Sequence, residues 1–81
     1  MKKTRQGRER NVIGARVRDA RLRRQPQVSQ DDLAGKLAAK GVSLDQTAIS
    51  RIENGTRYVM DYEVVALAKA LKVSVASLFG E

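Results

Sequence analysis

The side chains of this sequence that could recognise another molecule are concentrated in one short segment, residues 46–54. On a helix, its polar members share the side opposite Ile49 and Ile52. They are Thr47, Ser50, Arg51 and Asn54, and Gln46 lies at the exposed N-terminal end of the helix. Glutamine can pair with adenine, arginine with guanine, and serine or threonine with base edges or phosphate. The stripe therefore suits the DNA major groove, although any solvated helix is also polar on one side, and that alternative stays open.

Side chains for catalysis are scarce. The 81 residues include no cysteine and no histidine, which excludes thiol nucleophiles, disulfides, zinc fingers and imidazole bases. A small nuclease would need carboxylates clustered around a metal ion. Asp31 and Asp32 are the only adjacent pair, and capping and the helix dipole explain acidic residues at a helix start. We expect no enzymatic activity, no cofactor and no metal site.

Positive charge is concentrated in the first 24 residues. The chain has 16 Lys and Arg against 9 Asp and Glu, a formal net charge of +7. Residues 1–24 hold ten of the basic and two of the acidic side chains, so the remainder carries −1. This asymmetry predicts a polyanionic partner. Residues 1–10 lack apolar periodicity, and we expect a flexible basic arm that is disordered without DNA, or a merely solubilising tail.

Length and composition indicate one small domain, residues 11–81. No apolar run approaches the roughly 18 residues of a membrane span, and no apolar segment of a signal peptide follows the basic start. We expect a cytoplasmic protein associated with the nucleoid. With 42% apolar residues and no disulfide, the chain must bury its core efficiently, and short packed helices do so.

Apolar spacing predicts two helices in the first half of the domain. The first covers residues 12–24, with Asn11 as its N-cap and Pro26 preventing its continuation. The second covers residues 30–40, where Ser29 and Asp32 have the spacing of a capping box and Gly41 ends the apolar face.

Three further helices are predicted, and no strand. Asp45 caps a helix over residues 46–54, which ends at the Asn54 and Gly55 pair. Asp61 caps a fourth helix, on which Glu63 is expected to be exposed. Its inward residues are Val64, Val65, Leu67, Ala68 and Leu71. Ser74 caps a last turn or two that ends near Leu78 and Phe79.

Two charged residues fall on faces that should be buried. Arg21 lies four residues after Val17 on the first helix, and Glu53 lies four after Ile49 on the third. A lone buried arginine is costly, so we expect an Arg21–Glu53 ion pair. The alternative is that both side chains reach solvent independently at the helix ends.

Four blocks, in order, resemble the Cro and lambda-repressor-like helix-turn-helix family, also called XRE-type regulators. The blocks are Ile13 and Gly14 with Val17 and Arg21, residues 29–34, residues 48–55, and residues 67–74 with Leu78 and Phe79. The resemblance runs from about residue 11 to residue 80. It implies an all-α, compact five-helix bundle in which the second and third helices bind DNA and the third enters the major groove. It also implies the Arg21–Glu53 pair.

The resemblance implies site residues as well. The base-reading positions correspond to Gln46, Thr47, Ser50 and Arg51. Gln30 would touch a phosphate, and Asn54, Thr56 and Arg57 would approach the neighbouring phosphates. In the arm, we expect Arg5, Arg8 and Arg10 to contact phosphates as well.

The sequence departs from the family between Leu37 and Ile49, where it is several residues longer than the compact turn. We expect the second helix to gain a turn, with Val42 and Leu44 packed as a lid. A changed tilt of the third helix is the alternative.

These features predict a sequence-specific transcriptional regulator of double-stranded DNA, a repressor that occupies its operator. We expect a palindromic operator and a homodimer, at least on DNA. Val75, Leu78 and Phe79 are the expected self-contact. The alternative is an antitoxin or restriction-system controller whose helix-turn-helix domain also binds a protein.

Overall fold

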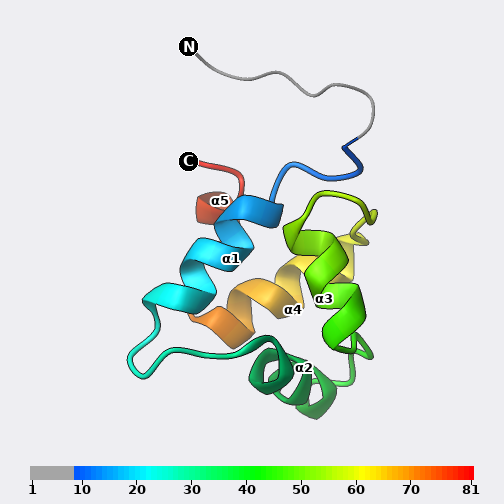
Figure 1. The fold of residues 1–81 in the computed structure, drawn as a ribbon. Coiled ribbons are helices and arrows are strands. Elements are labelled where there is room, and N and C mark those ends of the chain that lie inside the picture. The colour runs from blue at the N-terminus through cyan, green and yellow to red at the C-terminus, as the bar shows by residue number, and fades with distance from the viewer. Residues whose placement is uncertain (1–8) are drawn as a thin grey trace.

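The computed structural model describes residues 9–81, which form five helices and no strand (Figure 1). The helices are α1 (Gly14–Arg23), α2 (Gln30–Ala39), α3 (Gln46–Glu53), α4 (Asp61–Leu71) and α5 (Val75–Leu78). The predicted all-α class and the number of helices are therefore confirmed. Residues 1–8 of the predicted arm, including Arg5 and Arg8, lie outside the described residues.

Three helices begin at the predicted N-caps. The Ser29 hydroxyl accepts a hydrogen bond from the Asp32 N–H at 2.9 Å, and the Asp32 carboxylate accepts one from the Ser29 N–H at 3.2 Å. Asp45 accepts from the Ala48 N–H at 2.8 Å, and Ser74 accepts from the Ser77 N–H at 3.0 Å. Each bond satisfies an N–H that the helix itself leaves unpaired.

Helix α1 begins two residues later than predicted. Asn11 Oδ1 accepts hydrogen bonds from the N–H groups of Ile13 and Gly14, at 3.0 and 2.8 Å. Its Nδ2 donates to the carbonyl oxygens of Ile52 and Arg57, at 3.1 and 2.8 Å. Asn11 therefore ties the start of α1 to the end of α3 and to the following loop.

Gly14 permits the close approach of α1 to α3. A Cβ atom at this position would overlap the Ile52 carbonyl oxygen and would lie 3.0 Å from that of Glu53. Only glycine lacks this atom, so the sequence sets the spacing between the two helices at this point.

The start of α4 differs from the prediction. Asp61 is the first helical residue rather than the cap, and the N-cap is Met60, whose N–H donates to Glu63 Oε1 at 2.9 Å. Glu63 is buried, not exposed, and Val65 is 43% exposed rather than inward. The helix is rotated so that the Glu63 carboxylate lies beneath the preceding loop, where it finds partners.

The core lies around α4, which packs against α1, α2 and α5 (Figure 1). The fully buried side chains of the core include Val17, Leu33, Leu37, Ile49, Ile52 and Leu67. Helix α2 ends at Ala39, and residues 40–45 form the longer connection to α3. Leu44 is buried in the core and Val42 packs against it, as the predicted lid requires. No helix in residues 9–81 is long and apolar enough to cross a membrane.

Candidate nucleic-acid interface

Helix α3 presents one polar face to solvent. Ile49 and Ile52 are completely buried on its inner side. The four predicted base-reading residues lie on the other side or at its start: Gln46, Thr47 and Arg51 are exposed, and Ser50 is half-buried. The fold therefore brings these four side chains to one surface.

Helices α2 and α3 pack directly against each other and form the helix-turn-helix pair. In Figure 1, α3 lies at the edge of the molecule away from α5, with α2 below it. The Asp45 cap begins α3 directly after the connection, and Asn54 and Gly55 end it, with a φ of 79° at Gly55. This positive φ favours glycine and turns the chain back toward the body.

Gln30 links the two helices through its side-chain amide. Its Nε2 donates to Glu53 Oε1 at 3.1 Å, and its Oε1 accepts from Gln46 Nε2 at 3.3 Å. The amide of Gln46, at the exposed start of α3, is thereby oriented from α2. Gln30 retains one further N–H, which has no partner in these bonds.

The Arg21–Glu53 ion pair lies beneath this link. Arg21 Nε donates to Glu53 Oε2 at 2.7 Å and its Nη2 donates to Oε1 at 3.0 Å, in the two-pronged geometry that arginine and carboxylate favour. Arg21 Nη1 donates to the Val28 carbonyl oxygen at 3.1 Å. The two side chains are only 10% and 3% exposed, so the pair is part of the interior.

The charge of Arg21 is secured by its partner. The hydrogen bond to Glu53 is the largest influence and raises the pKa of Arg21; burial acts in the opposite direction, and the charge of Glu53 raises the pKa further. Arg21 is therefore charged at every pH at which the fold exists. Helix α3 is held to α1 through Glu53 while its other side stays free.

Asn54 and Thr56 lie beside the end of α3, and both are exposed. The Thr56 N–H and hydroxyl both donate to the Arg51 carbonyl oxygen, at 2.9 and 3.3 Å. These residues form the turn that follows α3, within reach of whatever lies against its exposed face.

Arg57, for which the resemblance implies a phosphate contact, forms an ion pair with Glu63 within the fold. Its Nη1 donates to Glu63 Oε1 at 3.0 Å and to the Tyr58 carbonyl oxygen at 2.8 Å, and its Nη2 donates to Glu63 Oε2 at 3.4 Å. These bonds direct the guanidinium to the start of α4 rather than to the α3 surface. Sequence reasoning missed this pair; the available signal was a glutamate three residues after Met60, the spacing of a capping box.

Glu63 is ionised in the fold although it is buried. Burial is the largest influence and acts to raise its pKa, but the hydrogen bonds from Arg57 and from the Met60 N–H, together with the charge of Arg57, outweigh it and lower the pKa. The carboxylate therefore holds the loop after α3 against α4.

Arg10 belongs to the body of the molecule. Its N–H donates to the Gly55 carbonyl oxygen at 2.7 Å, and its guanidinium lies 5.4 Å from the centre of the Tyr58 ring. The prediction of a mobile arm through residue 10 is therefore wrong at this residue, because a backbone hydrogen bond and a cation–π contact hold it. Its exposed guanidinium lies beside the turn that ends α3.

The carboxylates of the described residues do not gather. No group of three or more acidic side chains in residues 9–81 could hold a metal ion. Asp31 and Asp32 lie exposed in the first turn of α2, where the Asp32 carboxylate caps the Ser29 N–H.

Comparison with known proteins identifies the family. A sequence model described as helix-turn-helix matches residues 18–78, which span all of α2 to α5 and more than half of α1. The comparison with curated proteins gave no match, and neither did that with solved structures. The family match, the α2–α3 pair and the polar face of α3 agree, and the chain belongs to the Cro and lambda-repressor-like helix-turn-helix family of DNA-binding transcription regulators.

Proposed function

We propose that the protein is a repressor that recognises a specific operator in double-stranded DNA with the exposed face of α3 and blocks transcription by occupying it. The observation that carries this proposal is that Gln46, Thr47, Ser50 and Arg51 share a surface while Ile49 and Ile52, on the opposite side of α3, are fully buried. The side chains proposed for base recognition thus lie outside the core. Of the four, only Gln46 makes a side-chain hydrogen bond within the described residues.

Each of these side chains has a role that its chemistry suits. Arg51 has no intramolecular side-chain bond among the described residues and can donate two hydrogen bonds to guanine. The amide of Gln46 is oriented by Gln30 toward a base edge at the start of the helix. The hydroxyls of Thr47 and Ser50 complete the surface, and the small size of Ser50 lets α3 lie deep in the groove. An eight-residue helix is about 12 Å long, comparable with the width of the major groove.

Phosphate contacts supply affinity around this centre. We assign them to the remaining N–H of Gln30, to Asn54 and Thr56 in the turn after α3, and to the exposed guanidinium of Arg10. Arg5 and Arg8 add positive charge from the predicted arm. Each DNA phosphate that they neutralise releases a counterion, which makes the affinity for DNA depend on salt. Arg57 contributes indirectly, because it holds the turn through Glu63.

We propose that two copies bind a palindromic operator, because one α3 reads only a few base pairs. Half-sites would lie about 10 base pairs apart or a multiple of that distance. Of the three residues expected to form the self-contact, Leu78 is excluded because it is buried in the core. Val75 and Phe79 are 40% and 46% exposed and are available.

Selection of bound sequences from a random DNA library tests the proposal. We expect a palindromic consensus and, by ultracentrifugation, two protein chains on the selected duplex. Placed over a promoter, this operator should lower transcription when the protein is present. A consensus without palindromic symmetry or a strictly one-to-one complex would contradict binding by two copies. Unchanged transcription would contradict the repressor role.

Arg51→Ala then tests base reading. It should cost about 1–3 kcal/mol of discrimination for the selected operator and have less effect on random DNA. Lys69→Ala, at an exposed position on α4, is the matched control and should change neither affinity. If Arg51→Ala weakens binding to both duplexes equally, Arg51 contacts phosphate and does not read a base.

A further inference from the structure

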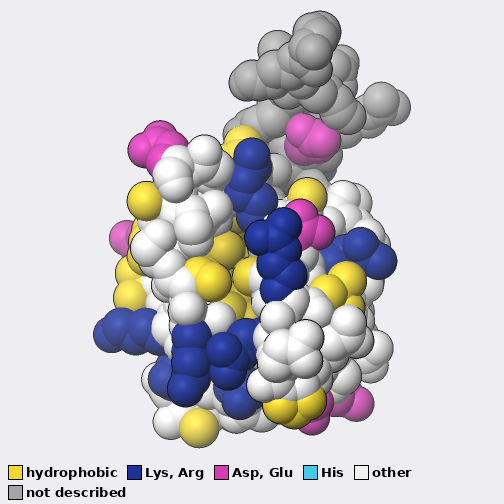
Figure 2. Space-filling view, turned by 90° about the vertical axis from the view of Figure 1, so that its left-hand side faces the viewer, with side chains coloured by type: hydrophobic (Ala, Val, Ile, Leu, Met, Phe, Trp, Pro, Cys, Tyr) yellow, Lys and Arg dark blue, Asp and Glu magenta, His cyan; other side chains and the backbone are white. Residues whose placement is uncertain are grey.

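A trough runs between α1 and the α4–α5 end of the molecule, on the side away from α3. It has a volume of about 580 Å³ and is open to solvent on one side. Figure 2, which views the molecule from the left-hand side of Figure 1, shows Lys and Arg side chains around an apolar hollow. We call this feature the α1–α5 trough.

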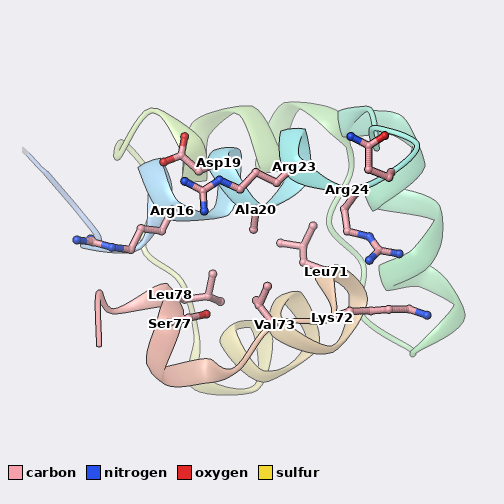
Figure 3. A pocket seen from close by; sticks show the side chains of 11 residues that line it. Arg16, Asp19, Ala20, Arg23, Arg24, Leu71, Lys72, Val73, Ser77 and Leu78 are labelled. Atoms are coloured by element: carbon pink, nitrogen blue, oxygen red, sulfur yellow. The ribbon is translucent and has the colours of Figure 1, made fainter.

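The floor of the α1–α5 trough is apolar and its edges are positively charged. Ala20 and Val73 are the partly exposed apolar residues of the floor, and the buried side chains of Leu71 and Leu78 lie beneath them. Arg16, Arg23, Arg24 and Lys72 line the edges, and Asp19 is the one acidic residue in the lining. In Figure 3, Arg16 lies toward one end, and Arg24 and Lys72 lie toward the other.

The spacing on α1 gives the trough its length. Arg16, Ala20 and Arg23 are four and three residues apart, so they share one side of the helix. Seven residues of helix separate the two arginines by about 10 Å along the axis. The floor between them therefore matches about two turns of a second helix.

The cations of the trough form no ion pair within the described residues. The ion pairs within residues 9–81 are Arg21–Glu53 and Arg57–Glu63, and neither uses a trough residue. Arg24 Nε is buried and has no hydrogen-bond acceptor among the described residues. It is the only buried side-chain nitrogen or oxygen atom of the described residues without a hydrogen-bond partner. A buried donor without an acceptor is unfavourable, and the Arg24 guanidinium at this end of the trough is therefore a group that a carboxylate would complement.

We propose that the α1–α5 trough binds an acidic amphipathic helix of a partner protein, with its apolar side on the floor and its carboxylates toward the cations at the two ends. Helices are commonly bound in this way by grooves that combine an apolar floor with charged edges. Because α3 lies on the other side, the partner and the operator can be bound at the same time. This inference does not rest on the repressor role.

Two other anionic occupants fit less well. A small organic anion is normally enclosed over most of its surface, whereas this trough is open along one side. A DNA backbone presents phosphates, for which an apolar floor offers no partner. A helix has both the apolar surface and the carboxylates that the trough complements.

The probe is a synthetic helical peptide of about 15 residues, with leucines along one side and glutamates next to them, carrying a fluorophore. A peptide of the same composition with the leucines scattered is its control. We expect fluorescence anisotropy to show about tenfold tighter binding of the patterned peptide, because only that peptide can cover the floor. Amide NMR shifts should change at Ala20, Val73 and Ser77, and not at Thr47 or Arg51.

Two variants test the edges and the floor separately. The double variant Arg16→Glu with Arg23→Glu reverses two exposed charges and should lower the affinity for the patterned peptide by about tenfold or more. Ala20→Met keeps the charge and fills the floor, and should weaken the peptide by a similar factor. The matched control, Lys40→Glu with Lys69→Glu, makes the same charge change at exposed positions outside the trough and should have less than about a threefold effect.

Four results would overturn the proposal. Equal binding of the patterned and scattered peptides would reduce the interaction to general charge attraction, as would an equal loss in the Lys40 and Lys69 control. Shifts confined to α3 would place the peptide on the DNA-binding face. A loss of DNA affinity, with no effect on peptide affinity, in the Arg16 and Arg23 variant would assign the trough to nucleic acid.

Discussion

Replacing Glu53 with alanine removes the partner of an arginine that the fold has already buried. In the native protein, Arg21 donates two hydrogen bonds to Glu53 and one to the Val28 carbonyl oxygen. Glu53→Ala deletes the first two and the neutralising charge, while the bond to Val28 remains. Gln30 also loses the acceptor of its Nε2.

The expected loss of stability follows from this geometry. Breaking a buried ion pair on one side costs about 3–5 kcal/mol. Arg21 keeps one acceptor and its side chain is 10% exposed, which places the cost near the lower end, about 3 kcal/mol. For a domain of this size each kcal/mol lowers Tm by about 4–8 °C, so we expect Tm to fall by roughly 12–24 °C.

Thermal and urea unfolding, followed by circular dichroism, measure the effect. Asp19→Ala is the matched control, since Asp19 is an exposed acidic residue on α1; Glu63 cannot serve because it is buried in its own ion pair. The double variant Arg21→Met with Glu53→Leu should be far more stable than Glu53→Ala, because neither charge remains to be compensated. A Glu53→Ala transition within error of the Asp19→Ala transition would refute the reasoning.

Three further predictions concern pH, packing and salt. Because the native pKa of Glu63 is lowered from its ordinary value of 4.5, its ionised form contributes stability above that pH, and this contribution is lost as the pH falls through the native pKa. The variant Glu63→Gln should therefore flatten this part of the profile of stability against pH, measured by urea unfolding. An unchanged profile would contradict the prediction. Gly14→Ala should cost about 1–3 kcal/mol, whereas Gly35→Ala, with open space around its Cβ, should stabilise by up to about 1 kcal/mol; equal Tm values for the two would be inconsistent with the α1–α3 contact. Deleting residues 1–8, which keeps Arg10, should reduce the slope of log affinity against log salt by roughly 1–3 units per chain, and identical slopes in DNA titrations would make the segment a solvated tail.

Local signals predicted the helices well. Ser29, Asp45 and Ser74 cap α2, α3 and α5 as their spacing indicated, because a cap depends on residues only three positions away. The five-helix fold follows from the same periodicity. The charged residues 21 and 53 could be matched from sequence because each interrupts an apolar stripe, and the structure places them in one ion pair.

Features that depend on how distant segments meet could not be predicted in this way. Glu63 is buried and Val65 is exposed, the reverse of the prediction. The orientation of α4 about its axis depends on the contact between Glu63 and Arg57 of the preceding loop. Asn11 was predicted to be the N-cap of α1, a position that Ile13 occupies, and its two bonds to the α3 end and loop join residues more than 40 positions apart. The exposed face of α3 was identified by periodicity, whereas the link from Gln30 to Gln46 needed the helix-turn-helix geometry.

The hydrogen bonds of Gln30 divide the α3 surface into two classes of position with different freedom to evolve. Thr47, Ser50 and Arg51 make no side-chain hydrogen bond within residues 9–81, so they can be exchanged without breaking any such bond of the fold. Gln46 is different, because its partner Gln30 also contacts the buried Glu53. New DNA preferences can therefore arise by changes at the first three positions on an otherwise constant scaffold, whereas a change at Gln46 also frees the amide of Gln30 and requires compensation within α2.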